Sequence, residues 1–115
     1  MSRIRYLKPD FFADDDLADL SYQARLAFAG LWCQADKAGR LEDNPRKLKA
    51  LIFPYDNLDF QKILEQLTKK PFIIRYRVDG KKYVQIINWE KHQKPHHSEK
   101  ESMILGGGGG GGGGG

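Results

Sequence analysis

A change of hydrophobic period at Pro71 is the feature that most constrains the fold of this chain. Before Pro71, apolar residues recur every three or four positions, which is typical of one face of a helix. After it, residues 72–78 and 82–89 alternate and are rich in β-branched and aromatic types. Asp79 and Gly80 separate these two runs, and Asp-Gly between alternating runs is the strongest short-range signal for a two-residue hairpin turn. The sequence therefore predicts helices followed by one antiparallel β-hairpin.

The predicted turn also fixes which residues face each other across the hairpin. Tyr76 would lie opposite Tyr83, and Arg77 opposite Lys82. Like charges directly opposite each other repel unless an anion lies against them. The register of the hairpin is therefore a first indication of anion binding.

The first half of the chain contains the longest predicted helix. Ser21 can cap it, because its hydroxyl accepts a hydrogen bond from an otherwise unpaired amide, and the helical period continues to about Asp36. Gly39 follows, and glycine commonly takes the left-handed conformation that ends a helix. Gly30 lies inside the helix, where close packing is the only reason we can suggest for it. A very short strand is expected at 40–42.

Two shorter helices are predicted next. Asp43 or Asn44 caps the first of them, with Pro45 at its first position, where the missing amide costs nothing. This helix ends before Pro54. The other helix covers about 58–69. The residues that we expect to face inward from the three helices are Ala24, Ala27, Phe28, Leu31, Ala35, Leu48, Leu51, Ile52, Phe60, Ile63, Leu64 and Leu67.

The chain has 115 residues and is expected to form one small domain. Residues 1–20 are predicted to be an N-terminal arm with a short helix, in which Phe11 and Phe12 dock on the core. Residues 21–90 form the main domain, and residues 91–105 a basic polar tail that is extended or mobile. Residues 106–115 are ten glycines, which bury nothing and are not part of the fold.

Composition favours an ordinary globular protein. Hydrophobic residues make up 40% of the chain and charged residues 30%, and no apolar run has the roughly 18 residues that a membrane span needs. No secretory signal is recognisable at the N-terminus. Cys33 is the only cysteine, which suits a reducing compartment. We therefore expect a cytoplasmic protein without a membrane partner.

The order of the predicted elements indicates the fold class. A long helix, a minimal strand, two short helices joined by a turn and then a hairpin form the pattern of an α+β winged helix-turn-helix domain. In that fold the third core helix lies in the DNA major groove, and the hairpin, called the wing, touches the DNA backbone or the minor groove. Double-stranded DNA is therefore the predicted partner.

Charge is distributed unevenly along the chain. Residues 1–44 contain six Lys/Arg and eight Asp/Glu, whereas residues 45–105 contain thirteen and seven. A basic surface of this kind is expected to contact DNA phosphates. The predicted DNA-binding residues are Arg46, Lys47, Lys49, Gln61, Lys62, Gln66, Lys69, Lys70, Arg75, Arg77, Lys81 and Lys82.

Two kinds of DNA contact are possible within this set. Gln61 and Gln66 could read adenine edges, and Lys62 could reach guanine or a phosphate. Asp59 and Glu65 on the same helix would repel phosphates, so base reading is the weaker expectation. The cations of the helix ends and of the wing favour contact with the phosphate backbone.

Several short blocks of the sequence resemble a known family. They are RIRYLKPDFF at 3–12, ARLAFAGLW at 24–32, GRLEDNPRKLKA at 39–50, FPYD at 53–56 and QIINWEKHQKPH at 85–96. These blocks resemble the N-terminal domain of phage and prophage replication proteins, described as replisome organisers or DnaD-like initiators. The resemblance spans about residues 3–100.

The resemblance implies a winged-helix fold and DNA replication as the process. It also implies binding at or near a phage replication origin, and replication proteins as possible partners. Some members of the family act as transcriptional regulators, which leaves that role open. The part that recruits the helicase or its loader in the family has no counterpart here, so helicase loading is not predicted for these residues. No functional residue is transferred from the family.

Other chemistries are less well supported by the sequence. Cys33, His92, His96 and His97 include the ligand types that zinc prefers, but no second cysteine accompanies Cys33. Asp10, Asp79 and Lys81 match pieces of a nuclease pattern, but Asp79 would lie at an exposed hairpin tip. No nucleophile with an oriented base is recognisable. We therefore expect neither a metal nor another cofactor, and no enzyme activity.

Two alternative binding modes stay open. Tyr76, Tyr83 and Trp89 could stack on the bases of single-stranded DNA. The same fold could instead serve as a protein-interaction module that forms a homo-oligomer through exposed aromatic residues. Tyr22, Trp32 and Phe60 are expected in the core.

Overall fold

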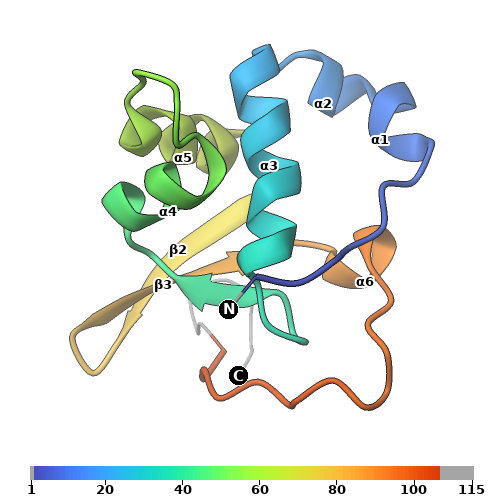
Figure 1. Cartoon of the computed structure of the whole chain (residues 1–115), viewed down its shortest axis with the longest axis vertical. Coiled ribbons are helices and arrows are strands. Elements are labelled where there is room, and N and C mark those ends of the chain that lie inside the picture. The colour runs from blue at the N-terminus through green and yellow to red at the C-terminus, as the bar shows by residue number, and fades with distance from the viewer. Residues whose placement is uncertain (1, 107–115) are drawn as a thin grey trace.

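The predicted hairpin forms the larger part of a three-stranded antiparallel sheet in the computed structural model, which describes residues 2–106 (Figure 1). β2 covers Ile73–Val78 and β3 covers Lys81–Ile86. Asp79 and Gly80 have φ values of 51° and 79°, as the predicted turn requires. The register places Tyr76 opposite Tyr83 and Arg77 opposite Lys82, so the sequence prediction is confirmed.

The third strand comes from an earlier part of the chain. β1 covers Arg40–Glu42, as expected, and pairs with β3, so that the order of strands in the sheet is β1-β3-β2. One predicted strand was too long: β3 ends at Ile86, and Trp89 begins a short helix instead. The side chain of Trp89 is buried, and its indole Nε1 donates a hydrogen bond to the carbonyl oxygen of Lys37 (2.8 Å).

Six helices lie within residues 2–106. Figure 1 shows α3, α4 and α5 grouped together, with α1 and α2 on the other side of α3. The fold is therefore of the α+β class. The helices are α1 (Asp10–Ala13), α2 (Asp15–Ala18), α3 (Tyr22–Gln34), α4 (Pro45–Ile52), α5 (Phe60–Lys69) and α6 (Trp89–His92).

Side-chain caps determine where the three longer helices begin. The Ser21 hydroxyl accepts a hydrogen bond from the Ala24 amide (3.1 Å), and the Asn44 side chain accepts one from the Lys47 amide (3.1 Å). Asp59 caps α5 in the same way. Ser21 was predicted as a cap, and Asn44 is the correct choice of the two candidates for α4.

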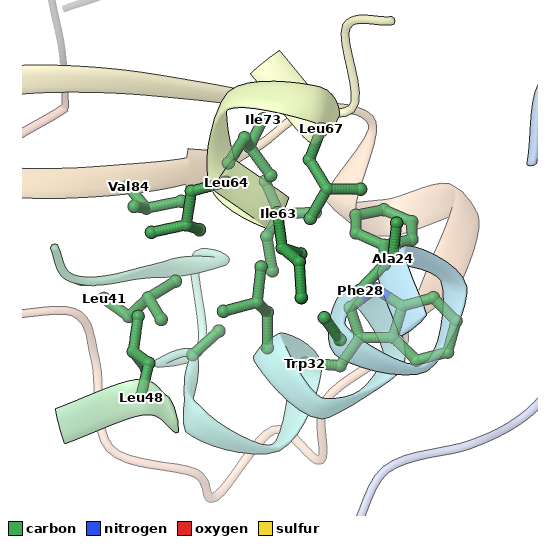
Figure 2. Close-up of a cluster of buried hydrophobic side chains, with 14 of the residues drawn as sticks. Ala24, Phe28, Trp32, Leu41, Leu48, Ile63, Leu64, Leu67, Ile73 and Val84 are labelled. Carbon is green, nitrogen blue, oxygen red and sulfur yellow. The ribbon is translucent and has the colours of Figure 1, made fainter. Parts of the chain in front are cut away.

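The core contains most of the residues predicted for it (Figure 2). All four inward positions of α5, Phe60 among them, are buried, as is Trp32. Tyr22, Leu51 and Phe12 are corrections, because 83%, 47% and 72% of their surfaces are exposed. α3 has apolar residues on two faces, and Tyr22 lies on the face opposite the buried one.

The arm and the tail are held against each other and against α3. The Gln93 side chain is buried and exchanges two hydrogen bonds with the backbone of Tyr6 (2.8 and 2.7 Å). Glu99 accepts hydrogen bonds from Arg5 (2.9 and 3.0 Å) and forms an ion pair with Arg3 (3.2 Å). The hydrogen bonds from Arg5 lower the pKa of Glu99. Residues 93–106 thus contain no helix or strand but are anchored.

Among residues 2–106, no helix combines the length and the apolar composition that crossing a membrane requires.

Two glycines allow close approach between elements. A Cβ atom at Gly30 would lie 2.6 Å from Cγ2 of Ile52, so this glycine lets α3 and α4 pack closely, as suggested. Gly39 has a φ of 78° and lies between α3 and β1, after the helix has already ended at Gln34. A Cβ atom at Gly39 would lie 2.6 Å from Cγ of Trp89.

Replacement of Gly39 by Ala is expected to lower the free energy of unfolding by about 3 kcal/mol, because the left-handed backbone costs about 1–2 kcal/mol and the overlap with Trp89 adds to it. Gly80→Ala is the matched control. Gly80 has a φ of 79°, but a Cβ atom there would meet no heavy atom within 4 Å. Urea denaturation measures both, and equal losses would contradict the packing of Trp89 on Gly39.

Candidate nucleic-acid interface

A buried ion pair joins the helices to the hairpin. The carboxylate of Asp43, directly after β1, accepts hydrogen bonds from Nε (2.7 Å) and Nη2 (3.0 Å) of Arg75 on β2. Nη2 also donates to the side-chain oxygen of Gln61 at the start of α5 (2.8 Å). The backbone amide of Asp43 donates to the carbonyl oxygen of Lys82 on β3 (3.0 Å). We call Asp43, Arg75 and Gln61 the junction, because they hold both hairpin strands beside the starts of α4 and α5.

The junction changes the expected roles of two residues. Arg75 and Gln61 were predicted to contact DNA, but their side chains bind partners inside the protein. The amide nitrogen of Gln61 donates to Glu65 (3.0 Å), so both of its polar atoms have partners. The charge of Arg75 is balanced by Asp43, whose side chain is only 3% exposed. Arg75 and Gln61 therefore hold the elements of the predicted DNA-binding surface in place and do not contact DNA themselves.

Two further predicted residues face the other side of the helices. The Lys70 ammonium lies 3.0 Å from a carboxylate oxygen of Asp19 and 3.9 Å from one of Asp16. The side-chain oxygen of Gln66 accepts a hydrogen bond from Ser21 (3.2 Å). Lys70 and Gln66 are therefore directed toward α2 and the start of α3.

The remaining cations of the predicted set form no ion pair within residues 2–106. They lie on three elements that meet at the junction, except for Lys69 at the far end of α5. All are exposed apart from Lys49, which is partly buried. Their positive charge is therefore available to an external anion. These residues are Arg46, Lys47 and Lys49 on α4, Lys62 and Lys69 on α5, and Arg77, Lys81 and Lys82 on the hairpin.

An open hollow of about 590 Å³ lies between the starts of α4 and α5. Arg46 and Lys49 line it from α4, and Phe60 and Gln61 from α5. Asp59 also lines it, but its carboxylate accepts hydrogen bonds from the Gln61 and Lys62 amides (3.0 and 3.4 Å). This carboxylate thus serves as a helix cap in a hollow that two cations, Arg46 and Lys49, also line.

The aromatic residues of the hairpin are less accessible than the sequence suggested. The Tyr76 and Tyr83 rings lie 5.9 Å apart, and both side chains are partly buried. The Tyr76 hydroxyl donates to the carbonyl oxygen of Leu105 (2.9 Å), and burial raises the pKa of Tyr76. Trp89 is buried and cannot stack on a base in this conformation.

Within residues 2–106, no three His, Cys, Asp or Glu side chains come close enough together to hold a metal ion. His92, one of the zinc candidates, stacks on the indole of Trp32 with ring centroids 5.3 Å apart. Its burial, reinforced by the charge of Lys91, lowers the pKa of His92. His92 is therefore a packing residue of the arm and α6 region.

No protein-family model, no curated protein and no solved structure matches this chain.

Replacement of Asp43 by Asn is expected to lower the free energy of unfolding by about 2 kcal/mol, because it leaves the half-buried guanidinium of Arg75 without a counter-charge. Asp79→Asn is the control, since Asp79 is exposed and Asn tolerates its positive φ. The control should change stability by no more than about 0.5 kcal/mol. A similarly small effect of Asp43→Asn would show that the ion pair does not hold the junction together.

Proposed function

We propose that this chain is a winged-helix domain that binds double-stranded DNA through the starts of α4 and α5 and through the β2–β3 hairpin. The observation that carries the proposal is the junction. It brings three elements together, each of which presents exposed cations without an acidic partner among the described residues. A surface of this kind neutralises several phosphates at once.

The topology supports the winged-helix assignment. The element order α3, β1, α4, α5, β2, β3 agrees with the order expected for that fold, and the hairpin strands pair with β1 in one sheet. In this assignment α4 and α5 form the helix-turn-helix, and β2 and β3 form the wing. The opposition of Arg77 and Lys82 on the wing also favours an anion there, because the two cations repel each other without one.

The surface favours phosphate contact over base reading. Both polar groups of the Gln61 side chain bind partners within the protein, and the side-chain oxygen of Gln66 accepts a hydrogen bond from Ser21. Neither glutamine therefore offers its full donor and acceptor pair for reading a base. Of the three α5 side chains considered for base reading, this leaves Lys62, which is exposed. Since phosphate contacts carry little sequence information, we expect modest sequence preference.

The resemblance to phage replication proteins suggests a biological setting for this binding. We infer that the DNA is a phage replication origin or lies near one, and that the domain acts as a binding module without catalysis. A transcriptional regulator would use the same surface on a different site. Selection of preferred sequences from random duplexes separates these two roles.

Fluorescence anisotropy with a short labelled duplex, measured over a series of salt concentrations, tests the DNA-binding proposal. Affinity should fall steeply with salt, by a slope of about 0.9 in log–log form for each phosphate that is neutralised. The combined variant Arg77→Ala, Lys81→Ala and Lys82→Ala should flatten the slope by about 2–3, because it removes up to three contacts.

The control variant changes Lys91, Lys94 and Lys100 to Ala. It removes the same charge from α6 and the tail, outside the proposed interface, and should leave the slope unchanged. Absence of binding at low salt would refute the proposal. An equal effect of the control would show that the net charge, and not this surface, attracts DNA.

A further inference from the structure

The end of the tail lies across a face of the molecule that is rich in cations. After α6 the chain turns back toward the sheet (Figure 1). There the carbonyl oxygen of Ile104 accepts a hydrogen bond from Arg40 on β1 (2.8 Å), and that of Leu105 accepts one from the Tyr76 hydroxyl on β2 (2.9 Å). We call residues 99–105 the strap.

The acidic side chains of the strap pair with further cations. Glu99 binds Arg5 and Arg3 of the arm, and a carboxylate oxygen of Glu101 lies 2.8 Å from the ammonium of Lys37. The strap thus places carboxylate or carbonyl oxygens against four cations of the rest of the chain. We call these four the cationic face: Arg3, Arg5, Lys37 and Arg40.

The strap is attached by polar contacts and not by buried apolar side chains. Met103 is 82% exposed and Leu105 68%, and the strap contains no helix or strand. Ion pairs at a surface contribute little individually and weaken with salt. The buried Gln93, with its two hydrogen bonds to Tyr6, lies before the strap. Residues 99–105 can therefore leave the cationic face without opening the core.

The contacts of the strap are of the kind that a phosphodiester chain makes. Nucleic-acid phosphates bind arginine, lysine and tyrosine side chains through anionic oxygens spaced along a backbone. Two acids also lie at this face. Asp36 accepts hydrogen bonds from the backbone amides of Ala38 (2.9 Å) and Arg40 (3.0 Å) and from the Ser102 hydroxyl, and Glu42 is exposed. The four cations outnumber these two acids.

The cationic face adjoins the proposed DNA interface. A hollow of about 320 Å³ is lined by Ile104 of the strap, by Arg3 and Arg40, and by Lys47 on α4. Asp36 and Glu42 line it as well. Lys47 belongs to the surface proposed to bind DNA, so the strap ends beside that surface.

We propose that the strap is autoinhibitory, that it occupies the cationic face in place of a phosphodiester chain, and that nucleic acid displaces it. Displacement adds Arg3, Lys37 and Arg40 to the surface that contacts phosphates. Arg5 keeps its hydrogen bonds to the carbonyl oxygens of Trp32 (3.0 Å) and Ala35 (2.9 Å), so the arm stays on α3. The inference rests on the proposed DNA binding and extends it.

The first test weakens the strap in the whole chain. Glu99→Gln combined with Glu101→Gln removes both acidic partners and keeps the shape of the side chains. Affinity for a short duplex at low salt should rise about fivefold, and the salt slope should steepen by about 1–2, because the freed cations contact one or two more phosphates. Circular dichroism checks that the variant stays folded.

The matched control combines Glu90→Gln with Asp15→Asn. It removes the same charge from exposed residues that form no ion pair within residues 2–106. Affinity should change by less than about twofold, and the slope should stay the same. An equal gain in the control would overturn the proposal, because net charge would then account for the tighter binding.

The second test follows the strap in the unmodified chain. The heteronuclear NOE of the amides at 101–105 reports fast backbone motion. It should have the value of ordered backbone in the free chain and fall toward that of a mobile chain when a duplex or a single strand of the same length is added. Release by only one of the two would identify which nucleic acid takes the place of the strap.

The outcomes separate this inference from the proposed function. Amide shifts around the junction with a strap that stays ordered would overturn the inference and leave the DNA interface standing. Release of the strap without shifts around the junction would support the inference and contradict that interface. Absence of binding by both nucleic acids at low salt would overturn both.

Discussion

The buried ion pair between Asp43 and Arg75 is the interaction on which the arrangement of the basic surface depends. A carboxylate that is almost excluded from water needs a counter-charge, and Arg75 supplies one with two hydrogen bonds. The same guanidinium holds Gln61, and the backbone of Asp43 holds β3. The relative positions of α4, α5 and the hairpin therefore follow from one network. Three elements that carry exposed cations, and that are distant in the sequence, are linked by it.

Features encoded by neighbouring residues could be predicted from the sequence. The turn at Asp79 and Gly80, its register and the cap at Ser21 depend on local backbone chemistry, and the structure agrees with each prediction. The junction could not be predicted in this way. Several cations and several acids were available, and only the tertiary fold determines that Asp43 meets Arg75. Asp43 was accordingly read as a possible helix cap.

The exposed face of α3 was missed for a different reason. One apolar stripe of α3 was assigned to the core, although the sequence contains a second apolar stripe at Tyr22, Leu26 and Ala29. That stripe was the available signal, and only the structure shows that α1 and α2 leave it partly uncovered. Trp89 shows the opposite error, because an aromatic residue at the end of an alternating run was assigned to the strand. In the structure Trp89 instead begins α6, and its indole packs on Gly39.

Mapping of the contact surface by NMR tests the central claim most directly. Backbone amide shifts of the isotope-labelled chain are recorded while a short DNA duplex is added at low salt. The largest changes should fall on residues 45–49, 60–62 and 77–82, around the junction, while the exposed face of α3 stays unperturbed. Changes confined to the arm, the tail or α3, with none around the junction, would contradict the proposed DNA interface.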